Sequence, residues 1–385
     1  MKKHQKHANI TKPNLGNFGR NEWAIIGTPC GNIQQLAYQL IEGLQKSFKV
    51  AYVDADHKNE DEPDNLEGEN PALAHGAHLE YTDKISHHRF DTQAKLDTFQ
   101  FRTLFNEQDL VLVNGNHFKA KNQIVVIDPR KEKSLEKKLD RLTNVELILL
   151  EGKATAVYPF LKDHLNEIEN IPVFRFSETH KIIEFILGKM FLTMPKLKGL
   201  VLAGGKSTRM GTDKGALNYH GKPQREYMAD LLNSMCETTF LSVRSDQNIE
   251  SESELLEDKF VGLGPFGAIL SAFQKDPNSA WLVVACDLPL LNQEALQFLV
   301  ENRNPSQLAT AFYNPATDFP EPLITIWEPK SYQVLLQFLS QGYSCPRKVL
   351  INSEIELLQL EDAKVLMNVN DKEGYENAKE IMIND

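Results

Sequence analysis

Three kinds of feature are scarce in this 385-residue sequence. It has only four cysteines, none of them in a CxxC pair, which excludes a disulfide framework and a zinc site of that spacing. No apolar run reaches the length of a membrane span, and none follows the basic first residues, so we expect neither a membrane segment nor a secretory signal. Basic residues number 42 against 53 acidic ones, which argues against nucleic-acid binding. We therefore expect a cytoplasmic protein with reduced thiols.

The length of the chain and its 41% apolar content predict two or more globular domains. In the first half, short apolar runs alternate with segments of helical spacing. The runs that we interpret as strands are residues 23–26, 50–54, 110–113, 124–127, 145–149 and 173–176. The same alternation restarts after Pro195, and residues 197–203, 240–243 and 281–285 are its strands.

This alternation predicts an α/β fold with two doubly wound, mainly parallel sheets in tandem. We expect a flexible leader over residues 1–20, a first domain over 21–192 and a second over 193–385. The first domain is predicted to be a degenerate P-loop-like fold, and the second a Rossmann-like fold.

The most informative run is LVLAGGKSTRMGTDK at residues 200–214. A strand leads into the paired glycines 204 and 205, and Arg209 and Lys214 follow. Glycines let backbone N–H groups approach a phosphate closely, and two cations neutralise its charge. The run is therefore typical of a nucleoside triphosphate site.

A second apolar strand, residues 281–285, ends in Cys286-Asp287-Leu288-Pro289. A carboxylate at the end of a strand, beside a phosphate site, is a natural Mg²⁺ ligand. Asp287 could instead cap a turn before Pro289. Together with the glycine loop, the pattern favours the metal.

These motifs resemble molybdenum cofactor guanylyltransferases over roughly residues 197–385. The resemblance rests on the glycine loop with Asp213-Lys214 one residue after Met210-Gly211, and on four further motifs in the same order. These are Gly221-Lys222-Pro223, Gly264-Pro265-x-Gly267, Cys286-Asp287-x-Pro289 and Asn368-Val369-Asn370. Sugar-nucleotide pyrophosphorylases share the glycines, but their lysine usually follows a later proline.

The resemblance implies GTP and molybdopterin as substrates and Mg²⁺ as cofactor. It implies that GTP is contacted by Leu202, Ala203, Gly204, Lys214, Asp258 and Asp287, and that Arg209, Lys214 and Asp287 are catalytic, with Asp287 on the metal. A position that is often Asn in the family falls at Ser242, where Arg244 could contribute instead.

The implied reaction transfers GMP from GTP to the terminal phosphate of molybdopterin and releases pyrophosphate. Alternatives are a nucleotidyltransferase that uses CTP or a sugar phosphate, and a non-catalytic molybdopterin carrier or chaperone. Molybdoenzymes or other cofactor-biosynthesis proteins are the expected protein partners. Candidate pterin contacts are residues 321–323 and 344–348, among them Arg347 and Lys348, which could equally be a solvated helix start.

In the first half, the sequence IIGTPCGNI at residues 25–33 lies where a P-loop would. The loop is a residue short, and Asn32 and Ile33 replace the lysine and hydroxyl that hold phosphates and Mg²⁺. Residues 109–115 are similar to a strand of the GTP-binding adaptor of molybdopterin guanine dinucleotide synthesis, with Asn114 in place of an acidic residue. We expect a degenerate domain, and we interpret Asp54, Asp56 and the histidines at 75, 78, 87 and 88 as surface residues rather than metal ligands.

Overall fold

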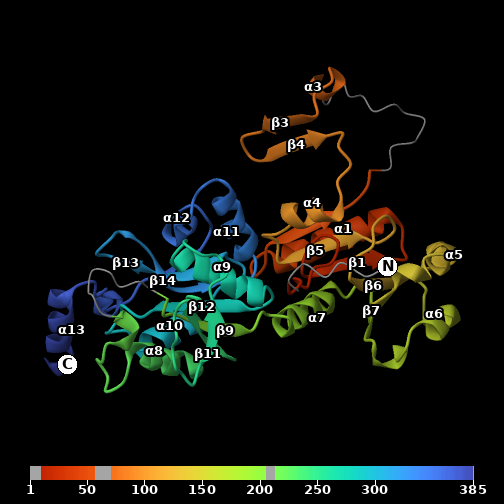
Figure 1. The fold of residues 1–385 in the computed structure, drawn as a ribbon. Coiled ribbons are helices and arrows are strands. Elements are labelled where there is room, and N and C mark those ends of the chain that lie inside the picture. Colours follow the sequence, from red (N-terminus) through yellow and green to blue (C-terminus); the bar gives the residue numbers. More distant parts are fainter. Residues whose placement is uncertain (1–9, 57–70, 205–212, 385) are drawn as a thin grey trace, which may run out of the picture. The chain divides into compact units, whose positions relative to one another are not determined.

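The computed structural model describes residues 10–56, 71–204 and 213–384, and the chain divides into two units. The amino-terminal unit is Leu15–Leu187, and the carboxy-terminal unit is Gly188–Asp385 with the residues before Leu15. Each unit has its own sheet with helices packed on it (Figure 1). Among the described helices, none is long and apolar enough to cross a bilayer.

The amino-terminal unit has a six-stranded parallel sheet in the order β2-β5-β1-β6-β7-β8. Both faces of this sheet are covered, which is why its central strands are continuous apolar runs. The strands are β1 (Glu22–Ile26), β2 (Val50–Val53), β5 (Leu110–Asn114), β6 (Asn122–Ile127), β7 (Val145–Leu150) and β8 (Val173–Arg175).

Alternate side chains of β1 face the two helix layers of this unit. Trp23 points toward α7 (Thr179–Leu192), where its ring lies 6.2 Å from that of Phe185. The helix α1 (Cys30–Leu44) lies beside α7, with Gly43 close to Ile183. Ile26 faces the other layer and packs with the buried Leu135 and Leu161. That layer consists of α4 (Thr98–Leu104), α5 (Glu132–Glu136) and α6 (Pro159–His164).

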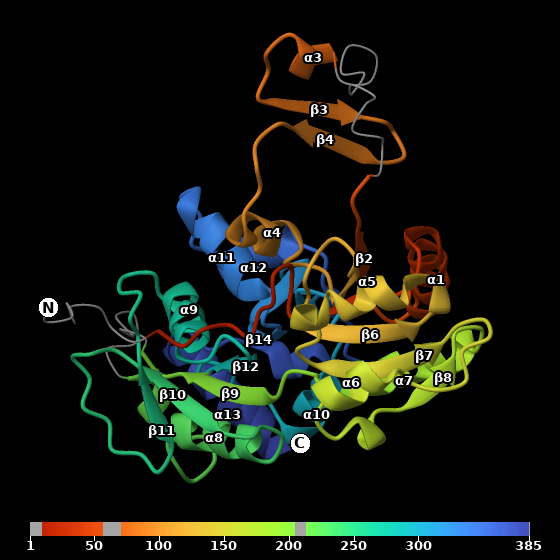
Figure 2. The same ribbon diagram turned by 90° about the vertical axis from the view of Figure 1, so that its right-hand side faces the viewer.

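A separate two-stranded antiparallel sheet follows a short helix, α3 (Pro71–Ala74), in the same unit (Figure 2). Its strands are β3 (Leu79–Asp83) and β4 (His88–Thr92). Side chains on both strands are exposed or only partly buried. The sequence patterns did not predict this hairpin.

The carboxy-terminal unit has a seven-stranded sheet in the order β11-β10-β9-β12-β14-β13-β15. All neighbouring strands are parallel except at β14, which runs antiparallel to β12 and β13. The strands are β9 (Leu197–Leu202), β10 (Thr239–Val243), β11 (Glu254–Glu257), β12 (Ala280–Ala285), β13 (Ala309–Asn314), β14 (Phe319–Trp327) and β15 (Glu356–Leu358).

Helices cover both faces of this sheet, so the prediction of doubly wound α/β folds is confirmed (Figure 1). One core lies between the sheet and α8 (Gln224–Asn233) with α10 (Gln293–Glu301). The other lies under α9 (Pro265–Lys275), α11 (Ser331–Ser340) and α12 (Pro346–Ile351). Two 3-10 turns, η4 (Lys214–Ala216) and η5 (Ala363–Leu366), and the last helix, α13 (Lys372–Asn384), complete the unit.

Of the expected leader, residues 1–9 lie outside the described part of the chain. Residues 10–20 form no helix or strand, but they make specific contacts. The backbone N–H of Asn14 donates to Asn278 Oδ1 at 2.6 Å within the carboxy-terminal unit. In the amino-terminal unit, Phe18 is buried and its N–H donates to the buried carboxylate of Glu22.

Candidate active site

Two neighbouring parallel strands of the carboxy-terminal sheet end side by side. Leu202 of β9 is in register with Ala285 of β12. The chain therefore leaves the sheet at Gly204 and at Asp287 on the same edge. The carboxyl ends of parallel strands are where open α/β sheets bind ligands.

A cavity of about 790 Å³ opens at this edge, a volume that suits a small-molecule ligand. Its lining includes all six residues to which the sequence resemblance assigned nucleotide contact: Leu202, Ala203, Gly204, Lys214, Asp258 and Asp287. The remaining predicted catalytic residue, Arg209, lies outside the described residues.

Asp287 is a largely buried carboxylate with one unsatisfied oxygen. Its Oδ2 lies 3.5 Å from Lys214 Nζ, whereas its Oδ1 is buried and accepts no hydrogen bond from any described group. Burial raises the pKa of Asp287, and the charge of Lys214 opposes that rise. A buried carboxylate oxygen without a partner is costly, so this position is suited to a cation.

Lys214 links Asp287 to the far end of the chain. Its Nζ donates to Asn370 Oδ1 at 2.7 Å as well as approaching Asp287. Sequence reasoning noted Asn370 as part of a motif but gave it no role, because the contact spans 156 residues. The ammonium group of Lys214 is therefore held at the cavity wall from two sides.

The backbone that carries Lys214 is fixed by its neighbour Asp213. One oxygen of Asp213 accepts the N–H of Gly215 at 3.0 Å and so caps η4. The other oxygen forms an ion pair with Arg225 Nη1 of α8 at 2.8 Å. Asp213 and Arg225 thus fix the direction in which the lysine leaves the loop.

The end of β10 fixes the described start of the glycine loop. Arg244 Nη1 donates to the carbonyl of Gly204 at 2.6 Å, and Gln247 Nε2 donates to that of Ala203 at 3.2 Å. The N–H of Ala203 is in turn bonded to the carbonyl of Ser242. Arg244, which could replace the family's Asn at the nucleotide, thus contacts the loop backbone in this structure. Gln247 is a residue that the sequence patterns missed.

Asp258 follows β11 and reaches the same cavity from the side of β10. Its Oδ1 accepts a hydrogen bond from Ser242 Oγ at 2.7 Å, and its Oδ2 is directed toward Gly204. Burial raises the pKa of Asp258, while Ser242 and Arg244 oppose this shift. The carboxyl group is a hydrogen-bond acceptor facing the start of the glycine loop.

The predicted pterin contacts divide into two groups. Leu323 lines the cavity, and the nearby Glu321 is buried with Arg347 Nη2 at 3.8 Å. Arg347 Nε is buried and has no hydrogen-bond partner among the described groups. Lys348, in contrast, lies with its Nζ 5.1 Å from the centre of the Tyr343 ring.

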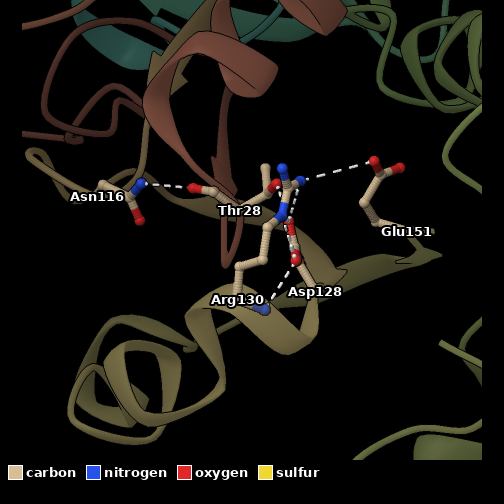
Figure 3. A network of polar contacts seen from close by, with 5 residues as sticks. All are labelled: Thr28, Asn116, Asp128, Arg130 and Glu151. Carbon is tan, nitrogen blue, oxygen red and sulfur yellow. Dashed lines mark hydrogen bonds and ion pairs between the residues drawn. The ribbon is translucent and has the colours of Figure 1, made fainter. Parts of the chain in front are cut away.

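The amino-terminal unit has a polar network at the corresponding edge of its own sheet (Figure 3). Thr28, in the loop after β1, is fully buried, and its hydroxyl donates to Asp128 Oδ2 at 2.6 Å. The carbonyl of Thr28 accepts a hydrogen bond from Asn116 Nδ2 at 2.8 Å. The loop is therefore bonded to the segments that follow both neighbouring strands, β5 and β6.

Both carboxylate oxygens of Asp128 accept hydrogen bonds. Besides Thr28, it accepts hydrogen bonds from the Arg130 side chain, at 2.7 Å from Nη2 to Oδ2 and 3.0 Å from Nε to Oδ1. Burial alone would raise the pKa of Asp128, but the hydrogen bonds from Arg130 and Thr28 outweigh it and lower the pKa. Glu151 lies 3.7 Å from Arg130 and adds a second carboxylate to this cation.

The structure also describes the other acidic and histidine candidates of this unit. Asp54 accepts hydrogen bonds from Tyr52 Oη at 2.5 Å and from Asn114 Nδ2 at 2.7 Å. Throughout the described ranges, no three His, Cys, Asp or Glu side chains gather as a metal site would require. Ile33 is fully buried, so its side chain packs in the core.

Comparison with known proteins places the carboxy-terminal unit in one family. The MobA-like NTP transferase domain matches residues 199–356. A molybdenum cofactor biosynthesis bifunctional protein of Synechocystis is 34% identical over 239 residues, which cover 60% of this chain and 67% of the relative. A probable molybdenum cofactor guanylyltransferase of Carboxydothermus hydrogenoformans is 30% identical over 195 residues, covering 49% of this chain and 98% of the relative.

Among solved structures, the Archaeoglobus fulgidus molybdopterin-guanine dinucleotide biosynthesis protein A is similar, with a TM-score of 0.43 and 22% identity. It covers 49% of this chain and 100% of its own. The sequence relatives and the domain match agree with the motifs around Gly204 and Asp287. The chain therefore belongs to the molybdenum cofactor guanylyltransferase family and is a nucleotidyltransferase of molybdenum cofactor biosynthesis.

Proposed function

We propose that this protein transfers GMP from GTP to the terminal phosphate of molybdopterin. A phosphate oxygen of molybdopterin attacks the α-phosphorus of GTP, the bond between that phosphorus and the α,β-bridging oxygen breaks, and pyrophosphate leaves. The nucleophile is already an anion, so the site needs no strong general base. Catalysis then depends on positioning and on charge neutralisation.

The observation that carries this proposal is the arrangement of Asp287 and Lys214 at one cavity wall. Lys214 supplies a fixed positive charge for the phosphates, and its contacts with Asn370 and Asp287 keep it in place. Arg209 is the second proposed cation. Removing one such charged contact typically costs about 3 kcal/mol or more of transition-state stabilisation.

Mg²⁺ fits Asp287 by the chemistry of its carboxylate. Mg²⁺ in nucleotide sites is commonly held by one or two protein carboxylates, with phosphates and water as the other ligands. The buried Oδ1 of Asp287, which accepts no hydrogen bond from described groups, would serve as such a ligand. When bound there, the ion would supply positive charge to the phosphates.

The position of Asp258 favours GTP over CTP as the nucleotide substrate. Guanine presents two adjacent donors, N1–H and the 2-amino group, to a single carboxylate, whereas cytosine presents one amino group. The Oδ2 of Asp258, directed toward Gly204, can accept from such an edge. In this proposal the backbone of residues 202–204 contacts the same nucleotide.

Arg347 is the proposed contact for the anionic end of molybdopterin, because its buried Nε is a donor without a described partner. We place the transfer domain at residues 193–385 and the reaction in the cytoplasm, where the four cysteines, which form no disulfide among the described residues, stay reduced. Molybdoenzymes that accept the finished cofactor are the proposed partners. The degenerate adaptor-like domain at residues 21–192 has no role in the transfer step.

A nucleotide panel tests the proposal. The full-length protein is incubated with molybdopterin, Mg²⁺ and GTP, CTP or ATP, and pyrophosphate release is measured. GTP should be used preferentially, and Asp287→Ala should lose at least about 100-fold in rate. Glu237→Gln is the matched control, since Glu237 pairs with Lys196 before β9, at the other edge of the sheet.

Wild-type pyrophosphate release from Asp287→Ala would overturn the assignment of the site. Activity with CTP but not GTP would overturn the choice of nucleotide and leave the site standing. Binding of molybdopterin without any pyrophosphate release, from any nucleotide, would favour the carrier alternative.

A further inference from the structure

Two adjacent side chains in the turn before α8 point to different elements of the active site. Tyr219 and His220 lie between η4 and α8, in a turn closed by a β-bridge between Asn218 and Pro223. Gly221 has a positive φ of 78°, a conformation that favours glycine. Neither Tyr219 nor His220 belongs to the residues that line the cavity.

His220 holds the segment that follows Asp287. Its Nε2 lies 2.9 Å from the carbonyl oxygen of Pro289, so this nitrogen carries the proton and donates. Burial lowers the pKa of His220, which favours the neutral ring. The ring stacks on Tyr227 with centroids 3.5 Å apart and an interplanar angle of 9°.

The segment from Asp287 to Leu291 is bonded at further carbonyls. The hydroxyl of Tyr227 donates to the carbonyl of Leu291 at 3.3 Å. The buried amide of Gln224 donates to that of Leu288 at 3.4 Å. The stacked pair of His220 and Tyr227 therefore belongs to a set of α8-side donors that fix this segment.

Tyr219 contacts the carboxy-terminal helix. Its ring lies 4.9 Å from that of Tyr375 in α13, and Lys379 Nζ lies 4.4 Å from the centre of the Tyr375 ring. Burial, with the neighbouring Tyr375 and Asp287, raises the pKa of Tyr219 to about 12. Tyr219 thus stays neutral and acts through packing.

The segment before α13 contacts two of the proposed catalytic residues, Asp287 and Lys214. The N–H of Val369 donates to the carbonyl of Asp287 at 2.8 Å, and Asn370 accepts from Lys214 at 2.7 Å. A shift of α13 would therefore move the partners of Asp287 and Lys214 together. Tyr219 opposes that shift from the turn that follows Lys214.

We infer that Tyr219 and His220 are positioning residues for nucleotidyl transfer, which hold the Asp287 segment and the α13 segment in register with Lys214. This inference rests on the proposed roles of Asp287 and Lys214. A misplacement of about 1 Å in a catalytic group can cost about 100-fold in rate. Loosening one of several contacts is expected to cost less, about 10-fold.

The test uses the full-length protein, pyrophosphate release and titrations of GTP and Mg²⁺. His220→Ala and Tyr219→Leu should each lower kcat about 10-fold and raise the Mg²⁺ concentration for half-maximal rate several-fold, with the KM for GTP changed less than about twofold. His220→Asn, whose amide can still donate, and Tyr219→Phe, which keeps the ring, should recover most of the loss.

Tyr332→Leu is the matched control, because Tyr332 stacks on Phe273 at 5.6 Å on the α9 and α11 face and contributes nothing to the cavity lining. It should lower the melting temperature about as much as Tyr219→Leu and leave kcat and the Mg²⁺ dependence unchanged.

The inference is overturned if His220→Ala and Tyr219→Leu keep wild-type kcat and Mg²⁺ dependence while Asp287→Ala is inactive. It is also overturned if Tyr332→Leu reproduces their kinetic losses, since the effect would then follow stability alone. Full activity of Asp287→Ala would instead refute the proposed site itself.

Discussion

Asp287 and Asp128 stand at matching places in the two sheets and differ in what surrounds them. Each follows the strand beside the one that leads into a glycine loop, β12 next to β9 and β6 next to β1. Both oxygens of Asp128 accept hydrogen bonds from Thr28 or Arg130. In Asp287, Oδ1 has no hydrogen-bond partner among the described groups. Two doubly wound sheets thus place an aspartate at matching strand ends, one with both oxygens hydrogen-bonded and one with Oδ1 without a described partner.

The loops that follow β1 and β9 also differ in how they are hydrogen-bonded. In the amino-terminal unit, the hydroxyl and the carbonyl of Thr28 are both bonded within the unit. In the carboxy-terminal unit, Arg244 and Gln247 hold the described start of the loop through the backbone carbonyls of Gly204 and Ala203, and the cavity lies beside them. Function therefore depends on the residues at the strand ends, and the doubly wound fold alone does not determine it.

The largest expected effect comes from comparing one lysine in each unit. Lys214→Ala should lower the rate of nucleotidyl transfer at least about 100-fold, because a cation next to the phosphates is lost. Lys138→Ala should leave the rate within about twofold, since Lys138 donates to the backbone carbonyl of Asn116 in the other unit. Steady-state pyrophosphate release measures both, and equal losses would mean that both units take part in transfer.

Asparagine substitutions at the two aspartates should change stability in opposite directions. Asp128→Asn should destabilise the amino-terminal unit by about 2 kcal/mol, because charge-assisted hydrogen bonds from Arg130 are lost. Asp287→Asn should stabilise the carboxy-terminal unit by about 1 kcal/mol, because it removes a buried charge whose pKa is raised. Hydrogen exchange with mass spectrometry resolves the two units.

The pH dependence of these two effects follows from the pKa shifts. The pKa of Asp128 is lowered in the folded state. Its contribution to the free energy of unfolding is therefore present above the unfolded-state pKa of about 3.9, and it is lost as the pH falls through the folded-state pKa. The pKa of Asp287 is raised, so its ionisation costs stability as the pH rises from about 3.9 through the folded value. Destabilisation by both substitutions at pH 7 would contradict this account.

Protons and Mg²⁺ should compete for Asp287. Because burial raises the pKa of Asp287, the rate should begin to fall on the acid side at a pH above about 4. A tenfold increase in Mg²⁺ should move this limb to lower pH by up to about one unit. Profiles of kcat/KM against pH at two Mg²⁺ concentrations test this. An acid limb whose position does not change with the Mg²⁺ concentration would count against Asp287 as the ligand.

The smallest effect is expected from restoring the P-loop lysine. Asn32→Lys should give no measurable GTP hydrolysis, because the loop stays bonded to Asn116 and Asp128 through Thr28. As a partly exposed substitution, it should change stability by less than about 0.5 kcal/mol. Isothermal titration with GTP would detect a second site, in addition to that of the carboxy-terminal unit, if this reasoning is wrong.

Much of the fold could be predicted because buried strands are plain in the sequence. Residues 110–113 and 281–285 are continuous apolar runs, and the structure has β5 and β12 there. The hairpin of β3 and β4 was missed because its strands are short, polar and half-exposed. β14 was missed because Pro320 and Pro322 argue against a strand.

The candidate site was predictable in its positions and not in its contacts. Asp287 and Lys214 could be identified because strand ends and glycine loops have local signatures. The bond from Lys214 to Asn370 joins residues 156 apart, and that from Thr28 to Asp128 joins residues 100 apart. Spacing along the chain carries no information about such contacts.

One measurement tests the central claim most directly. The claim is that Asp287, whose Oδ1 has no described hydrogen-bond partner, takes part in nucleotidyl transfer and that Asp128 does not. Mg²⁺-dependent pyrophosphate release from GTP and molybdopterin is compared for wild type, Asp287→Asn and Asp128→Asn, each shown to be folded. The account predicts a loss of at least about 100-fold for Asp287→Asn and a rate within about threefold of wild type for Asp128→Asn. Retained activity in Asp287→Asn, or an equal loss in Asp128→Asn, would contradict it.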